Sequence, residues 1–380
     1  MDRRINILPV PTWNKLSVNA AGDSLTLPEL TKELMDASAP HFEAGLLPAG
    51  VARMEEITDP RAVMEGIPED APLESGIGSY YDQYIKTQAN ARFFIKGTKE
   101  TAEDKADIDM KTSVRISAQS PYALSHHQIY AEEGSTLSLM QSISSDPGAE
   151  GLAADLTEIF AKKDATVRLF QIQTADVAVR SYQGVAIYAE EGATVEIVRA
   201  VMGSAAAACG TRALLSGKGS SYTLHAIYFA AGSQYFDFND IADHRAKNTT
   251  SDMYTAGALA GESRKILRGT IDFKKGASYA VGHEVEDVLM LSNKAKNRIV
   301  PLILCGEENV EGQHAASSGK PDERELYYLC TRGLTPKEAN RLIVEGRFAP
   351  VIDRIPDDEV REILSAEIER RLSLYEDSAQ

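Results

Sequence analysis

One stretch of ten residues gathers side chains that bind metal ions. It places the thiol of Cys305, the imidazole of His314 and the carboxylates of Glu307, Glu308 and Glu311 close together in the chain. A soft thiolate combined with imidazole and carboxylates fits iron, or a partly exposed iron–sulfur cluster with an open coordination position. We therefore expect Cys305, His314, Glu308 and Glu311 to be candidate metal ligands.

The same residues also have a purely structural interpretation. Cys305 would then be a small core residue that ends a strand at 302–304, and the glutamates would form a solvated turn. Cys209 and Cys330 fit a buried strand and a helix, respectively, better than a ligand role. The residues alone leave both interpretations open.

A second acidic region lies further upstream. It contains Asp237, Asp240, Asp243, His244 and Asp252, which could recruit a cation. Two carboxylates at a shallow cleft would also suit a carbohydrate-active enzyme. A hydrated outer face of the fold is the simpler expectation for these residues.

Several classes of function are disfavoured. The sequence lacks GxxxxGK[ST], GxGxxG after a strand, HExxH and GxSxG, which argues against a P-loop ATPase, a Rossmann dehydrogenase and a zinc protease. Forty basic and 56 acidic residues give a net charge of −16, which would repel nucleic acid. Three cysteines without CxxC spacing argue against a disulfide framework. With no apolar run long enough to cross a membrane and no leader-like start, we expect a cytoplasmic protein without a membrane partner.

An internal repeat must position these residues. Segments 129–139 and 187–197 match at seven of eleven positions, and segment 159–169 is a third copy. Weaker copies surround Gly219 and Gly276. The intervals of 30, 28, 27 and 57 residues, the last being about two periods, are typical of stacked repeat units.

Each copy has the pattern of a strand, a bend and a second strand. Apolar residues stand three and five positions after the bend and alternate with a mostly polar one, as in a half-buried strand. The bend is Gly in four copies and Asp164 in the other, which suits a positive φ. Five positions before the bend stand Ile129, Ile159, Ile187, Leu214 and Ile271. This pattern predicts a mainly β fold, a β-solenoid, with a β-sandwich or paired hairpins as alternatives.

The sequence predicts three regions. Residues 1–90 form an irregular N-terminal region with a short helix near 27–36, residues 91–320 form the β core, and residues 321–380 form a helical C-terminal domain. Thr335 begins a capping box with Pro at the first helical position. A second helix carries an apolar stripe that must cover the solenoid end or a partner: Val360, Ile363, Leu364, Ile368 and Leu372.

From residue 222 onward the sequence resembles the SufB/SufD family of iron–sulfur cluster assembly proteins. The resemblance is carried by the blocks at 232–251, 267–277, 310–319 and 325–334, and it covers roughly residues 90–375. It implies a right-handed parallel β-helix with a C-terminal helical domain that docks on the SufC ATPase. It also implies a scaffold role, without catalysis by this chain, in assembling nascent clusters and passing them on.

The resemblance implies specific residues and partners. His314 matches the family histidine at the end of the β-helix, near the surface where two subunits pair. The partners would be a SufC-like ATPase, a SufB/SufD paralogue or a second copy, and transiently a sulfur donor and apo iron–sulfur proteins. The cofactor would be a transient iron–sulfur cluster or iron, with no nucleotide bound by this chain. The candidate ATPase contacts are Leu326, Leu329, Thr335, Leu342 and Ile343.

The chain also departs from the family pattern. Gly312 stands where D-type members carry a cysteine, and Glu286 aligns with the functional cysteine of B-type members. A ligand role for Cys305 is therefore inferred from its chemistry and not inherited from the family. The B-type or D-type role stays open, as does homodimer or heterodimer. The other hypotheses are a carbohydrate-active β-helix enzyme that uses the 237–252 carboxylates and a purely structural subunit.

Overall fold

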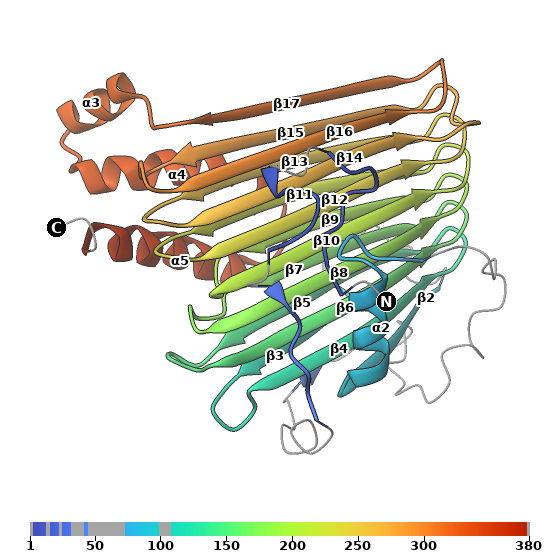
Figure 1. The fold of residues 1–380 in the computed structure, drawn as a ribbon, viewed down its shortest axis with the longest axis horizontal. Helices are drawn as coiled ribbons and strands as arrows, with labels where there is room; N and C mark the ends of the chain where they lie inside the picture. Colours follow the sequence, from blue (N-terminus) through green and yellow to red (C-terminus); the bar gives the residue numbers. More distant parts are fainter. Residues whose placement is uncertain are drawn as a thin grey trace.

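The computed structural model describes residues 3–12, 16–22, 25–31, 42–44, 73–98 and 108–377. Within them the chain forms two parallel sheets that alternate along the sequence, as a β-helix requires (Figure 1). The odd-strand sheet contains β1 (Phe42–Ala44), β3 (Met110–Ile116), β5 (Thr136–Ser145), β7 (Thr166–Gln173), β9 (Thr194–Val201), β11 (Ser221–Ala230), β13 (Thr250–Leu259), β15 (Val281–Met290) and β17 (Glu311–Gly319). The even-strand sheet contains β2 (Ala91–Gly97), β4 (Tyr122–Ala131), β6 (Gly151–Ala161), β8 (Val179–Ala189), β10 (Ala206–Leu215), β12 (Tyr235–His244), β14 (Arg264–Phe273) and β16 (Lys296–Cys305).

The mainly β, parallel β-helix prediction is confirmed. Every described strand pair is parallel except β1 with β3. The described helices are α2 (Ser79–Gln88), α3 (Glu323–Thr331), α4 (Pro336–Ile352) and α5 (Asp358–Asp377). A helix was predicted near 27–36, but residues 27–31 are not helical and the rest of that stretch lies outside the described residues. The residue pattern of 79–88 did not predict α2.

Each predicted bend joins a strand of the even-strand sheet to the odd-sheet strand that follows it. All five have a positive φ, from 56° at Asp164 to 103° at Gly276. Asn248, with a φ of 58°, is the bend between Gly219 and Gly276, so the 57-residue interval is two periods. Asparagine adopts a positive φ more readily than most other residues. The bend at Asn248 therefore contains no glycine and could not be recognised from the glycine pattern of the repeat.

The apolar rows fill the space between the sheets, with one correction. Ile129, Ile159 and Ile187 are ladder neighbours, but the next residue in the row is Ala213 and not Leu214. The turn after β10 is one residue longer than the turn after β8, and the amides of Ser216 and Gly217 both bond to one carbonyl, that of Ala189. A slip of one residue moves a side chain to the other face of a strand.

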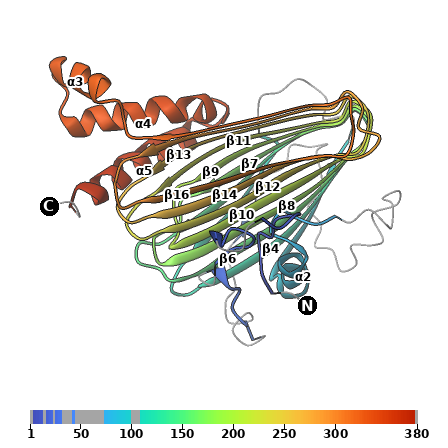
Figure 2. The same ribbon diagram turned by 45° about the horizontal axis from the view of Figure 1, so that its top comes forward.

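Both outer faces are covered by the chain's own ends. The N-terminal segment and α2 pack on the even-strand sheet through Ile77, Tyr81 and Ile85, and α4 and α5 pack on the odd-strand sheet (Figures 1 and 2). In α5, Leu364, Ile368 and Leu372 are buried against that sheet, and Val360 is packed against the same cluster. These residues therefore cover the outer face of the chain's own sheet, which corrects the prediction of the solenoid end, whereas Ile363 of the same stripe is exposed. The capping box at Thr335 is present as predicted.

Candidate functional site

The β-helix ends in two open strands. β16 and β17 are the last strands of their sheets, so each has one backbone edge without a neighbouring strand in the described chain. All nine residues of β17 are exposed. An unprotected, long edge strand is a template for pairing with another chain. This open end is where the predicted ligands lie.

Cys305 is the last residue of β16. It lies beside Phe273 in the ladder, in a slot that faces the interior in earlier coils. Because no further coil follows, the thiol is exposed, and it donates a hydrogen bond to the carbonyl oxygen of Glu307 at 3.1 Å. The strand at 302–304 is confirmed, whereas burial of Cys305 in a core is wrong. Cys209 is buried in β10, as expected.

The glutamates after Cys305 form an exposed turn. The carboxylate of Glu307 accepts hydrogen bonds from the amides of Gly276, at 2.9 Å, and Glu308, at 3.0 Å, which lower its pKa. The side chain of Glu308 is exposed. Glu311, at the start of β17, accepts a hydrogen bond from Gln313 at 2.8 Å. Glu307 therefore organises the turn, while the carboxylates of Glu308 and Glu311 are in contact with solvent.

His314 is exposed on β17 above a buried group of charges. Its ladder neighbour is Glu284, whose pKa is raised to about 8 by burial and then by the charge of Glu286. Glu286 forms a buried ion pair with Lys265, and it accepts a hydrogen bond from the Tyr228 hydroxyl at 3.0 Å. This group was not anticipated, because charged residues in an alternating strand are expected to face water.

The predicted metal ligands share one end of the β-helix but do not form a metal centre within one chain. The described residues include no group of three or more His, Cys, Asp or Glu side chains placed to hold a metal ion. Cys305, His314, Glu308 and Glu311 are nevertheless all exposed at the open end. Their role as ligands stays a prediction that needs further donors.

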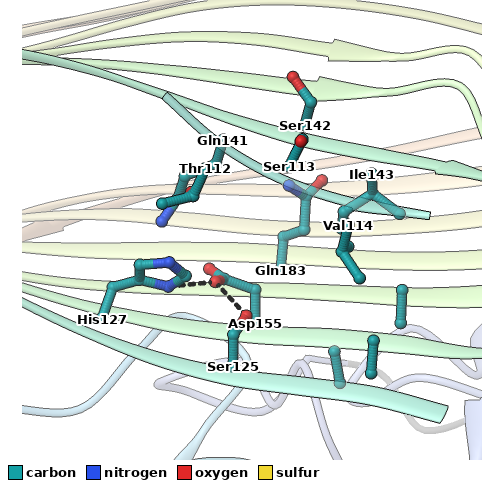
Figure 3. A pocket seen from close by; sticks show the side chains of 13 residues that line it. Thr112, Ser113, Val114, Ser125, His127, Gln141, Ser142, Ile143, Asp155 and Gln183 are labelled. Carbon is teal, nitrogen blue, oxygen red and sulfur yellow. Dashed lines mark hydrogen bonds and ion pairs between the residues drawn. The ribbon is translucent and has the colours of Figure 1, made fainter. Parts of the chain in front are cut away.

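A chain of buried polar side chains runs through the interior behind this end. Arg199 contacts Gln171 and Asp240 at 3.2 and 3.1 Å, and Gln171 is 3.3 Å from Gln141. The chain continues through Thr157 to Asp155, which also contacts Ser125 and His127. Figure 3 shows Asp155, Ser125 and His127 beside a small cavity of about 20 Å³, which is large enough for one water molecule.

The upstream acidic region is buried, which corrects the expectation of a hydrated face. Asp237 points outward beneath the N-terminal segment, where it pairs with Arg268 and accepts a hydrogen bond from Asn6. Asp240 points inward to Arg199. Asp243 pairs with Arg212 and Arg245, and His244 is buried between hydroxyls. Asp252 alone is exposed, so these residues provide no pair of carboxylates across an open cleft for carbohydrate hydrolysis.

The C-terminal helices present an apolar surface beside the β-helix. Tyr327, Tyr328, Leu342 and Ile363 are exposed, with Tyr327 the most exposed at 74%. Among the predicted ATPase contacts, Leu342 is exposed, Leu326 and Leu329 are half-buried, and the exposed Thr335 caps α4. Ile343 is buried against the chain's own sheet. None of the helices in the described residues is long and apolar enough to span a membrane.

The fold and its open end define a class of protein: a parallel β-helix with an unpaired terminal coil and a helical appendage. The family model for the SUF system FeS cluster assembly SufBD core domain matches residues 114–347. The chain belongs to this family, which confirms the resemblance seen in its sequence.

Curated relatives agree. The chain is 33% identical over 158 residues to the iron–sulfur cluster assembly protein SufD of Bacillus subtilis, which covers 42% of this chain and 36% of that protein. It is 26% identical over 253 residues to SufBD family proteins of Staphylococcus epidermidis and Staphylococcus haemolyticus, which covers 66% of this chain and 54% of each relative. The matches thus span between about a third and about half of these relatives' length.

Proposed function

We propose that this chain is a scaffold subunit of a SUF-type iron–sulfur cluster assembly complex. It pairs with a like subunit and with a SufC-like ATPase, assembles nascent clusters and transfers them to apoproteins. The observation that carries the proposal is the open end of the β-helix, where the unpaired strands β16 and β17 carry Cys305 and His314. The family match supports the assignment to cluster assembly.

A second subunit supplies what this end lacks. Iron–sulfur clusters are commonly held by about four protein ligands, and one chain offers one thiol and one imidazole at its open end. Pairing of two β17 edges, either with a second copy or with a SufB/SufD paralogue, brings a second set of side chains to the same place. The iron and sulfide assembled there are cargo, and the sulfide comes from a separate donor protein.

The C-terminal helices provide the surface that binds the ATPase. Exposed large apolar side chains on neighbouring helices are typical of protein interaction surfaces, and Tyr327, Tyr328 and Leu342 provide them on α3 and α4. ATP is bound and hydrolysed by that partner, and this chain acts without catalysis. All three of its cysteines are free, which suits the reducing cytoplasm.

Co-expression with the SufC-like ATPase and the second subunit of the same system tests the scaffold role. We expect the three chains to co-purify, and failure to do so would refute the proposal. A second experiment tests the ligands: anaerobic reconstitution of the complex with iron and sulfide, followed by visible absorption. The chromophore should weaken in Cys305→Ser and His314→Ala and persist in the control Cys330→Ser. Unchanged spectra in both variants would remove the ligand assignment and leave the scaffold role intact.

A purely structural subunit is the second candidate. The lack of a three-ligand group among the described residues favours it. In that case the Cys305→Ser and His314→Ala complexes would assemble and bind iron and sulfide as the wild type does. Ala315→Lys, which places a charge on the exposed β17 edge, would still disrupt assembly.

A further inference from the structure

A basic pocket lies between the N-terminal segment and the outer face of the even-strand sheet. Its volume is about 530 Å³, and Ser17 and Gly22 of the N-terminal segment form one wall. The opposite wall comes from β12, β14 and β16 and includes Arg264, Lys296 and Arg298. Pockets of about 300–1,000 Å³ are the usual size for small-molecule sites.

The positively charged side chains in this pocket lie close to one another. Arg264 and Lys296 are direct ladder partners across β14 and β16. Arg298 is two residues beyond Lys296, so its side chain lies on the same face of the strand. Like charges directly opposite each other in a sheet destabilise it. An anion bound between these side chains would relieve the repulsion.

Among the described residues, Glu262 is the one carboxylate that lines the pocket, and it forms no ion pair with Arg264, Lys296 or Arg298. Arg264 and Lys296 form no ion pair in the described part of the chain, and Arg298 donates its hydrogen bond to a backbone carbonyl, that of Leu16, at 3.0 Å. Glu262, which also lines the pocket, is 3.2 Å from the amine of Lys294. The pocket is therefore an exposed basic site on a protein whose net charge is −16.

The remaining walls suit a small ligand. Tyr235 is the ladder partner of Arg264 on its other side, and its hydroxyl donates to Asp237 at 2.7 Å, which fixes the ring. Ile266 adds apolar surface, and the hydroxyls of Ser17 and Ser233 add hydrogen-bonding groups. Guanidinium groups bind phosphate and carboxylate groups in bidentate fashion, and lysine adds a point charge.

We propose that this pocket binds a small polyanion, with Arg264, Lys296 and Arg298 as its charged contacts. The ligand class is a phosphate-bearing or polycarboxylate molecule. Lys296 and Cys305 stand at opposite ends of β16, about 30 Å apart at the usual rise of a strand. The pocket shares β16 with the open end but is distant from Cys305, and it stands independently of the function proposed above.

Calorimetric titration of the full chain tests the proposal, with inorganic pyrophosphate and citrate as two separate probes at low ionic strength. We expect one or both probes to bind, and the tighter one identifies phosphate or carboxylate as the recognised group. Arg264→Ala and Lys296→Ala should each weaken binding at least about tenfold, which corresponds to about 1.4 kcal/mol. Lys218→Ala, which removes an exposed lysine in a turn outside the pocket, is the matched control and should bind like the wild type.

A second measurement does not depend on the choice of probe. Without ligand, Arg264→Ala should raise the melting temperature slightly, because it removes the repulsion with Lys296. The proposal is overturned if neither probe binds, if the pocket variants bind like the wild type, or if Lys218→Ala weakens binding equally. It is also overturned if the pocket variants change the oligomeric state but not probe affinity, because the basic side chains would then belong to a subunit interface.

Discussion

The buried carboxyl of Glu284 lies directly beside the exposed His314, its register partner across β15 and β17. The two residues mark the boundary between the interior of the β-helix and its open end. Burial raises the pKa of Glu284 to about 8. The coil beneath the proposed assembly surface therefore contains a neutral carboxyl group at physiological pH, next to the ion pair of Lys265 with Glu286.

The stability of the chain should depend on the protonation of Glu284. Its pKa is about 8 in the folded chain and 4.5 as a free side chain, so the folded state binds the extra proton between these values. The protonated carboxyl therefore stabilises the folded chain by at most a few kcal/mol. This stabilisation is fully present below about pH 4.5 and is lost as the pH rises through 8. Glu284→Gln should flatten this decline in urea unfolding. The exposed Glu191→Gln should retain it, and an equal decline in both variants would exclude Glu284 as its cause.

The attachment of α2 should weaken in acid. Burial alone would raise the pKa of Glu158, but its hydrogen bond with His126 and the charge of Lys86 lower the value to about 2. The stabilisation is therefore present above about pH 4.5 and is lost as pH falls through 2, on the order of 2 kcal/mol. Hydrogen exchange of α2, corrected for intrinsic rates, should show this loss. Glu158→Gln should exchange faster already at neutral pH and change less on acidification.

Two glycines should control how closely the N-terminal segment approaches the sheet. A Cβ on Gly76 would lie 2.2 Å from the carbonyl oxygen of Asn239, and one on Gly210 would lie 2.4 Å from the amide nitrogen of Ile77. Backbone atoms cannot move aside cheaply, so each Gly→Ala change should destabilise the chain by about 2 kcal/mol or more. Gly346→Ala in α4 is the control: nothing lies within 4 Å, and alanine favours a helix by up to about 1 kcal/mol. The melting temperature should fall in the Gly76→Ala and Gly210→Ala variants and rise in Gly346→Ala. Equal shifts in all three variants would contradict the packing described.

The edge of β17 should govern subunit pairing. Ala315 is exposed on this strand, and lysine on an edge strand discourages pairing with another chain. Ala315→Lys should shift the protein to a smaller species in light scattering and leave thermal stability within about 0.5 kcal/mol. Gln119→Lys, in the exposed loop between β3 and β4, should retain the larger species. Pairing that survives Ala315→Lys would place the subunit interface elsewhere.

Most of the fold could be predicted from the repeat in the sequence. Gly134, Gly192 and Gly276 mark the bends because a positive φ is costly for other residues, and Ile129 and Ile187 mark the interior row because each coil offers the same space. Such constraints recur and are visible in one chain without a structure.

What the sequence could not reveal is what lies outside or between these rows. Phe170 points away from the interior and is buried in the cluster that the outer face of the odd-strand sheet forms with the C-terminal helices. Asp240 faces the interior because Arg199, 41 residues away, neutralises it. Both depend on contacts between distant segments, which alternation of residue types does not encode. For the same reason Cys305 could be placed at the end of a strand, but its exposure depended on where the stack of coils ends.

The buried polar chain from Asp155 to Asp240 also bears on how the coils find their order during folding. Isoleucine rows are interchangeable, so a coil skipped or stacked out of turn would bury almost the same aliphatic surface. The guanidinium of Arg199 is not interchangeable, because a misplaced neighbour would leave it buried without its carboxylate partner. A buried charge pair at one specific position in the stack therefore favours the correct order of the coils over orders that bury a similar aliphatic surface.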